Sequence, residues 1–147
     1  MAVREIGEGI YAVGAIDWDR RLFDGLIPLP DGTSYNSYLI KGSQNVALMD
    51  TVNPPMADVL LDHLSQLGVG NIDYVVAHHA EQDHSGAIPQ VLGRYAQAKV
   101  VCTSRCKGML MDLLLIPEDK FITVEDKETL SLGDMTLEFI HAPWVHW

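Results

Sequence analysis

A run of six mostly apolar residues, IDYVVA at positions 72–77, leads directly into the polar segment HHAEQDHSG at positions 78–86. A short apolar run that is rich in β-branched residues is typical of a strand buried in a sheet. The polar segment is then expected to be a loop at the C-terminal end of that strand. Its first seven residues include three histidines and two carboxylates, so this loop is the strongest candidate for metal chemistry.

Strand-like and helix-like segments alternate along the rest of the chain. Further strands are predicted at residues 9–16, 34–41, 45–50, 99–103, 121–124, 129–132 and 135–141, the second and third of them joined as a hairpin. Helices are predicted from Pro54 to Gly68, over 88–95 and over 106–115, because apolar residues recur there at helical spacing. This alternation after an antiparallel start predicts an α/β fold, a mixed sheet covered by helices. The 147 residues are the size of one domain, over 1–147.

One connection, residues 17–33, is unusually long and has two prolines, two glycines and no periodicity. A connection of this length in a compact domain is usually functional or disordered. Trp18, Phe23 and Leu26 make it too apolar for a disordered segment. We expect it to be a lid over a site or an interface with a partner.

Composition excludes several classes of function. The net charge is −10, with only ten Lys and Arg residues, whereas binding to a phosphate backbone needs clustered basic residues. No apolar run approaches the roughly 18 residues of a membrane span, and residues 1–8 lack the apolar core of a signal peptide. We therefore expect a cytoplasmic protein without a nucleic-acid partner or a membrane partner.

The two cysteines, Cys102 and Cys106, are four positions apart, at the end of a predicted strand and early in a predicted helix. Two thiols are too few for a disulfide framework, and the spacing is not the CxxC of zinc or thioredoxin-like sites. They are predicted to be reduced thiols that are buried or half-buried.

The pattern H-x-E-x-D-H at 79–84 can serve two metal ions. In an extended loop, residues 79, 81 and 83 would share one face, and residues 83 and 84 would point apart. Imidazoles together with carboxylates suit first-row transition metals, and the high share of carboxylates favours iron or manganese over a structural zinc ion. The candidate ligands are His79, Glu81, Asp83 and His84.

Three further histidines, His63, His78 and His141, are expected to have supporting or structural roles. His78 would face away from His79 in an extended loop, which favours a role in supporting the ligands or a buried neutral ring. His63 lies among the leucines of a predicted helix, and His141 ends a predicted strand. None of the three is predicted to bind a metal.

The pattern H-x-E-x-D-H and a histidine 62 residues after His84, His146, together resemble the flavodiiron proteins, also called A-type flavoproteins. The flanking segments WDRRLFDGLIPLPDGTSYNSYLI, DHSGAIP and TLSLGDMTLEFIHAPWVHW are similar to this family too. The resemblance covers the whole chain and matches the N-terminal part of such proteins. It implies the metallo-β-lactamase-like fold, an αββα sandwich, of which this chain would be the N-terminal portion.

The resemblance also implies a ligand set. His79, Glu81 and His146 would bind one iron, and Asp83 and His84 would bind the other. The bridging aspartate, the last histidine ligand and the flavodoxin-like FMN domain of the family would all lie beyond Trp147. With three ligands for one ion and two for the other, weak or single metal occupancy is expected unless another segment or polypeptide completes the site.

The implied activity is reduction of O2 to water or of NO to N2O, with electrons from FMN in the partner subunit of a head-to-tail homodimer. The FMN would be reduced by an electron donor protein or a reduced coenzyme. Hydrolases of the same fold typically carry a histidine where this chain has Glu81. A carboxylate ligand stabilises ferric iron and so favours redox chemistry over hydrolysis.

Three alternatives remain from the sequence. A diiron protein without flavin could bind or sense O2 with no turnover. A non-catalytic remnant would bind no iron and serve only in protein interaction. A zinc hydrolase of the metallo-β-lactamase fold would contain zinc and turn over a thioester or a lactam.

Overall fold

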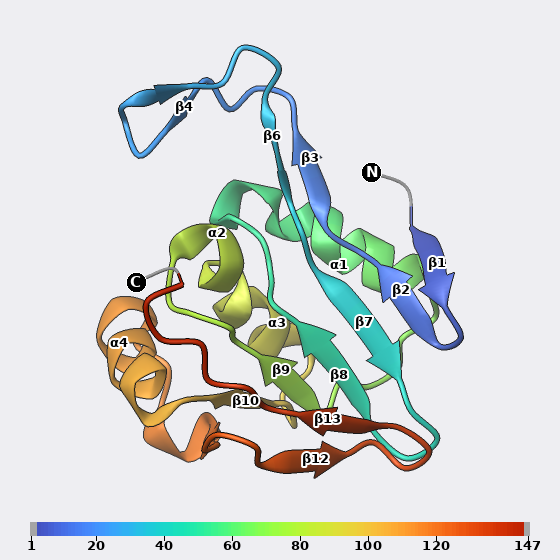
Figure 1. The fold of residues 1–147 in the computed structure, drawn as a ribbon. Coiled ribbons are helices and arrows are strands. Elements are labelled where there is room, and N and C mark those ends of the chain that lie inside the picture. The colour runs from blue at the N-terminus through green and yellow to red at the C-terminus, as the bar shows by residue number, and fades with distance from the viewer. Residues whose placement is uncertain (1–2, 146–147) are drawn as a thin grey trace.

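The protein, seen here in a computed structural model, is described over residues 3–145. A seven-stranded sheet forms its centre, in the order β1-β2-β7-β8-β9-β10-β11 (Figure 1). These strands are β1 (Arg4–Gly7), β2 (Ile10–Ala12), β7 (Tyr38–Lys41), β8 (Val46–Met49), β9 (Tyr74–Val76), β10 (Lys99–Cys102) and β11 (Phe121–Thr123). Neighbours from β1 to β8 pair antiparallel, and those from β8 to β11 pair parallel. The mixed sheet predicted from the sequence is confirmed.

Helices cover one face of this sheet. The helical segments are η1 (Pro54–Met56), α1 (Ala57–Gln66), α2 (Gln82–Ser85), α3 (Ile88–Arg94), α4 (Ser104–Leu114) and η2 (Glu118–Lys120). Leu60 of α1, Val91 of α3 and Leu110 of α4 are fully buried in one cluster with Leu48 and Val75 of the sheet. Burying apolar faces of this kind is the main stabilising contribution in such a fold.

The opposite face of the sheet packs against a hairpin made of β12 (Thr129–Ser131) and β13 (Thr136–Glu138). Val76 and Val101, whose side chains alternate with those of the helix-facing residues, join Leu130 and Leu137 in a second apolar cluster. Helices, sheet and hairpin therefore form three successive layers (Figure 1). This layering agrees with the N-terminal portion of an αββα sandwich.

An arm projects from the sheet between β2 and β7 (Figure 1). It consists of β3 (Ala15–Asp17) paired with β6 (Thr33–Tyr35), and of a hairpin of β4 (Leu22–Phe23) and β5 (Ile27–Pro28). The sequence predicted a non-periodic connection over 17–33, and the hairpin corrects that prediction. The predicted strand 9–16 is instead two strands, which separate at Gly14, where a Cβ would collide with the backbone carbonyl of Tyr35.

The predicted strand 34–41 is also divided, into β6, which pairs with β3 in the arm, and β7 of the central sheet. The remaining predicted elements lie close to their expected places. The helix that begins at Pro54, and the strands predicted near 72–77, 99–103 and 121–124, are all present with slightly shorter bounds. The strand β1 was not predicted. Within the described residues, every helix is too short or too polar to cross a bilayer.

Candidate metal centre

The candidate ligands lie at one edge of the central sheet. Strands β8, β9 and β10 are parallel, so their C-terminal ends meet there. Asp50 follows β8, and the segment that begins at His78 follows β9 after Ala77. Ligand sites in open α/β sheets usually form at this edge, because the connecting loops gather there. The predicted place of the cluster, directly after a buried strand, is therefore correct.

The ligand segment is only partly extended. Glu81 has extended backbone angles, φ −66° and ψ 140°, and the short helix α2 begins directly after it. Asp83 and His84 therefore lie in a helical turn, so the expectation of an extended loop through residue 83 is wrong. The turn is fixed because the carbonyl of His84 accepts the backbone N–H and the hydroxyl of Thr51, each at 2.7 Å.

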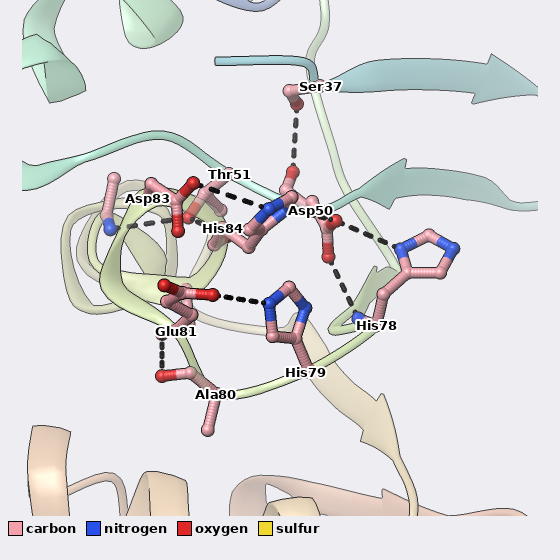
Figure 2. Close-up of polar contacts among 11 residues, drawn as sticks. Ser37, Asp50, Thr51, His78, His79, Ala80, Glu81, Asp83 and His84 are labelled. Carbon is pink, nitrogen blue, oxygen red and sulfur yellow. Dashed lines mark hydrogen bonds and ion pairs between the residues drawn. The ribbon is translucent and has the colours of Figure 1, made fainter. Parts of the chain in front are cut away.

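The four candidate side chains gather in two contacting pairs (Figure 2). The first pair is His79 and Glu81, whose Nε2 and Oε2 atoms are 3.1 Å apart. The second is His84 and Asp83, whose Nε2 and Oδ2 atoms are 3.5 Å apart. The rings of His79 and His84 bring the pairs together, with their centroids 4.4 Å apart.

These spacings fit neighbouring ligands of one metal ion. Two donor atoms at about 2.1 Å from a metal lie about 3.0 Å apart at a right angle and about 3.4 Å apart at a tetrahedral angle. The distance of 3.1 Å in the pair of His79 and Glu81 matches the first arrangement. The distance of 3.5 Å in the pair of Asp83 and His84 is close to the second.

Asp83 supplies an independent observation that favours a bound cation. Its Oδ1 atom is buried and has no hydrogen-bond partner. A buried carboxylate oxygen without a partner is costly unless a cation or a water molecule satisfies it. The nitrogen and carboxylate donors together suit iron, so the residues present fit a metal pair. In their present positions, however, no three such side chains in residues 3–145 converge on one point as a complete metal site.

Asp50 is a candidate functional residue that was not predicted from the sequence. Its Oδ2 atom is 2.8 Å from Nδ1 of His84 and 3.1 Å from Nδ1 of His78, and its Oδ1 accepts the backbone N–H of His78 at 2.9 Å (Figure 2). Burial would raise the pKa of this carboxyl, but the hydrogen bonds from His78 and His84 hold it at about 2. Asp50 is therefore an anion that holds both rings.

This anion fixes the tautomer of His84. A carboxylate can only accept, so Nδ1 of His84 donates to it, and Nε2 is left facing Asp83. The hydrogen bond to Asp50 also raises the pKa of His84, in opposition to burial. A histidine ligand is commonly oriented in this way, by a carboxylate on its other ring nitrogen.

The backbone of Asp50 is also strained. It has a φ of 56°, in the left-handed region that residues other than glycine rarely adopt. The hydroxyl of Ser37 donates to the carbonyl of Asp50 at 2.8 Å, and the backbone N–H of Asp50 donates to the carbonyl of Val76 at 2.8 Å. The signal in the sequence was a lone acid directly after the buried strand VALM.

The other histidines are placed as follows. The ring of His78 contacts the carboxylate of Asp50 rather than either ligand pair, which agrees with the predicted supporting role. His63 is buried, with Nδ1 2.9 Å from the carbonyl of Val13, and has a structural role. His141 has a buried Nε2 with no hydrogen-bond partner. His146 lies outside the described residues, so its role as a ligand stays a prediction.

Sequence comparison places the chain in a family. The profile described as "ODP family beta lactamase" matches residues 33–147. The chain belongs to this family. Its relatives include a coenzyme F420H2 oxidase of Methanothermobacter marburgensis, with 37% identity over 99% of this chain and 37% of the relative. They also include a nitric oxide reductase of Moorella thermoacetica, with 38% identity over 97% of this chain and 36% of the relative.

Comparison of structures agrees. The flavodiiron protein of Giardia intestinalis superposes with a TM-score of 0.91 and 34% identity, over 100% of this chain and 36% of that protein. The predicted resemblance to the N-terminal part of flavodiiron proteins, and the metallo-β-lactamase-like fold, are thereby confirmed. The chain spans a little over a third of the length of these relatives.

Proposed function

We propose that this chain contributes the first ligands of a non-haem diiron centre in a flavodiiron oxidoreductase that reduces O2 to water or NO to N2O. The two contacting pairs carry this proposal, because each has the spacing of neighbouring ligands to one metal ion. His79 and Glu81, with His146, would hold one iron. Asp83 and His84 would hold the second, and the buried Oδ1 of Asp83 supports a cation there.

An iron pair held there would, in its ferrous form, supply the two electrons that, with two protons, coupling of two NO molecules to N2O and water requires. The residues of the chain set the conditions for that chemistry. Glu81 brings a negative charge to the first pair, which would favour the ferric state of an iron bound there. Asp50 holds the ring of His84 with Nε2 toward Asp83, and α2 keeps both donors in one turn.

The source of electrons belongs to the same proposal. FMN in a flavodoxin-like domain would supply them, and an electron donor protein or a reduced coenzyme would reduce the FMN. One relative is named for oxidation of a reduced coenzyme and another for reduction of nitric oxide. The FMN would come from the other subunit of a head-to-tail homodimer or from a complementing polypeptide. A cytoplasmic location is part of the proposal.

The arm is our candidate for the contact with that partner. Trp18, Leu22, Leu26 and Ile27 expose apolar side chains along it, and exposed apolar groups of this size favour burial in an interface. Figure 1 shows the arm projecting beyond the sheet, above the region of α2.

A single-turnover assay tests this function. The polypeptide, with any partner that co-purifies, is loaded anaerobically with ferrous iron and mixed with NO or O2, without added reductant. We expect N2O formation or O2 consumption in proportion to bound iron, and loss of both in Glu81→Ala. Asp112→Asn, at an exposed site on α4, is the matched control.

Iron that binds at two per chain and leaves both gases unconsumed would contradict the reductase. Reversible O2 binding in that experiment would instead favour the flavin-free O2-binding protein. Zinc in place of iron, with turnover of a lactam or a thioester, would indicate the hydrolase.

A further inference from the structure

Two cysteines lie next to each other at the edge of the sheet that carries the metal centre. Cys102 is the last residue of β10, and Cys106 is in the first turn of α4. Both are free thiols, and they are only 3% and 7% exposed. Thr103 lies between them and caps α4, because its hydroxyl oxygen accepts the backbone N–H of Cys106 at 3.2 Å. Strand end and helix start are thus held together around the pair.

The two thiols lie in the same buried cluster, and each shifts the pKa of the other in the opposite direction. The hydrogen bond from the Cys102 thiol lowers the pKa of Cys106, in opposition to burial. The same contact and burial raise the pKa of Cys102. The place of Cys106 in the first turn of an 11-residue helix also favours a thiolate, because the N–H groups and the dipole of the helix point toward it.

We propose that Cys102 and Cys106 are a redox pair that closes to an intramolecular disulfide on reaction with hydrogen peroxide and reopens with thiol reductants. This site is separate from the metal ligands and does not depend on the proposed reductase activity. Burial of both thiols selects a small oxidant over a protein disulfide, since a bulky partner could not reach the sulfur of Cys106.

The reaction has two balanced steps. The Cys106 thiolate attacks one oxygen of H2O2, the O–O bond breaks, and the protonated products are a sulfenic acid on Cys106 and one water molecule. The thiol of Cys102 then attacks that sulfur, and the S–O bond breaks with release of a second water molecule. In sum, two thiols lose two electrons and two protons, and one H2O2 becomes two water molecules.

Closure to a disulfide requires the two side chains to approach each other closely. A disulfide needs Cβ atoms about 3.5–4.5 Å apart and then fixes an S–S bond of about 2.05 Å. Cys102 and Cys106 lie in one buried cluster, at the end of β10 and in the first turn of α4, so the two thiols are neighbours in the fold. The backbone of Cys102 stays fixed by its carbonyl, which accepts the N–H of Val124 at 3.0 Å.

A tryptic map under non-reducing conditions tests the disulfide directly. Cleavage after Lys99, Arg105 and Lys107 separates the two cysteines into the peptides VVCTSR and CK, which stay together only through a disulfide. The folded chain is treated with H2O2 in the presence of an iron chelator and is then alkylated. We expect the linked peptides, or the uncleaved segment 100–107 lacking two hydrogens, and separate alkylated peptides after reduction.

Two variants test the assigned roles. Cys102→Ser should leave Cys106 to stop at the sulfenic acid, which dimedone traps, and then to over-oxidise. In Cys106→Ser, the Cys102 thiol should react with H2O2 at least about tenfold more slowly than the Cys106 thiol does in Cys102→Ser, because the Cys102 thiol is not activated. Circular dichroism checks that each variant is folded.

Three results would overturn the proposal. One is wild-type protein that keeps its fold and both free thiols after the H2O2 treatment. Another is a single sulfinic acid without the linked peptides. The third is the appearance of the linked peptides only when urea is present, since the native arrangement would then not form the bond. Equal H2O2 rates in the two variants would contradict the assigned roles.

Discussion

Asp50 and His84, 34 residues apart in the chain, meet through a 2.8 Å contact between a carboxylate oxygen and Nδ1. The contact joins the end of β8 to the turn of α2 and so connects the central sheet to the ligand segment. It leaves Nε2 of His84 directed at Asp83. The geometry of the candidate centre therefore depends on a residue outside the candidate ligand set.

Asp50→Asn is expected to weaken metal binding at the pair of Asp83 and His84. The amide has no charge to hold the ring of His84, and losing a carboxylate that orients a histidine ligand typically costs about 10–100-fold in affinity. Titration with ferrous or cobaltous ion, followed by absorption or calorimetry, measures the change. Asp112→Asn on the exposed face of α4 is the control. Equal affinities in Asp50→Asn and wild type would show that Asp50 does not orient the ligand.

Glu81→His is expected to shift metal preference from iron toward zinc. The change replaces a carboxylate with a neutral nitrogen donor at the first pair, and so removes charge that stabilises ferric iron. Competition between equal concentrations of the two ions, with elemental analysis of the bound metal, gives the ratio. Glu138→His on β13 has an exposed side chain and should leave the ratio unchanged. An unaltered ratio in Glu81→His would place Glu81 outside the metal shell.

Leu48→Ala should destabilise the fold by about 2–5 kcal/mol, the usual range for deleting a fully buried leucine side chain. Leu48 is 0% exposed in the central strand β8. Leu113→Ala, where the leucine is 57% exposed on α4, should change stability by less than about 0.5 kcal/mol. Urea unfolding followed by circular dichroism compares the two variants. Similar losses in both would mean that β8 is not at the centre of the core.

Asp134 links two turns and predicts a dependence of stability on pH. The backbone N–H of Ser43 donates to its Oδ1 at 2.7 Å, and this hydrogen bond holds the pKa of Asp134 below its usual value. A lowered pKa in the folded state means that the stabilisation is present above the unfolded pKa of 3.8 and is lost as pH falls through the lower folded value.

Asp134→Asn should therefore be less stable than wild type by a constant amount well above the unfolded pKa of 3.8, and the difference should shrink as pH falls below that value. Urea unfolding at a series of pH values measures this. Asp112→Asn should show no such change with pH. A difference between Asp134→Asn and wild type that grows on acidification would have the wrong sign for this hydrogen bond.

Much of the fold follows from local patterns in the sequence. Apolar periodicity predicts α1 and α3, and the β-branched run before His78 predicts β9, because each pattern reflects burial on a known face. The hairpin of β4 and β5 was missed although its turn contains Asp24-Gly25, both with positive φ. Asp-Gly between two short apolar segments is a strong hairpin signal, and the surrounding prolines masked it.

The candidate site was predictable only in part. The ligand types and their place after a buried strand follow from the segment 78–86 itself. The role of Asp50 does not, because its contact with His84 arises from the pairing of β8 with β9 and from the position of α2. A pattern along the chain carries no information on which distant acid will face a given ring.

The central claim is that the two side-chain pairs each hold one iron, and anomalous diffraction at the iron absorption edge tests it most directly. Crystals of the chain, with any partner that completes the site, would be soaked anaerobically in ferrous iron. We predict two peaks, one against His79 and Glu81 and one against Asp83 and His84. Peaks elsewhere on the protein, or a cluster that stays empty at saturating iron, would contradict the account.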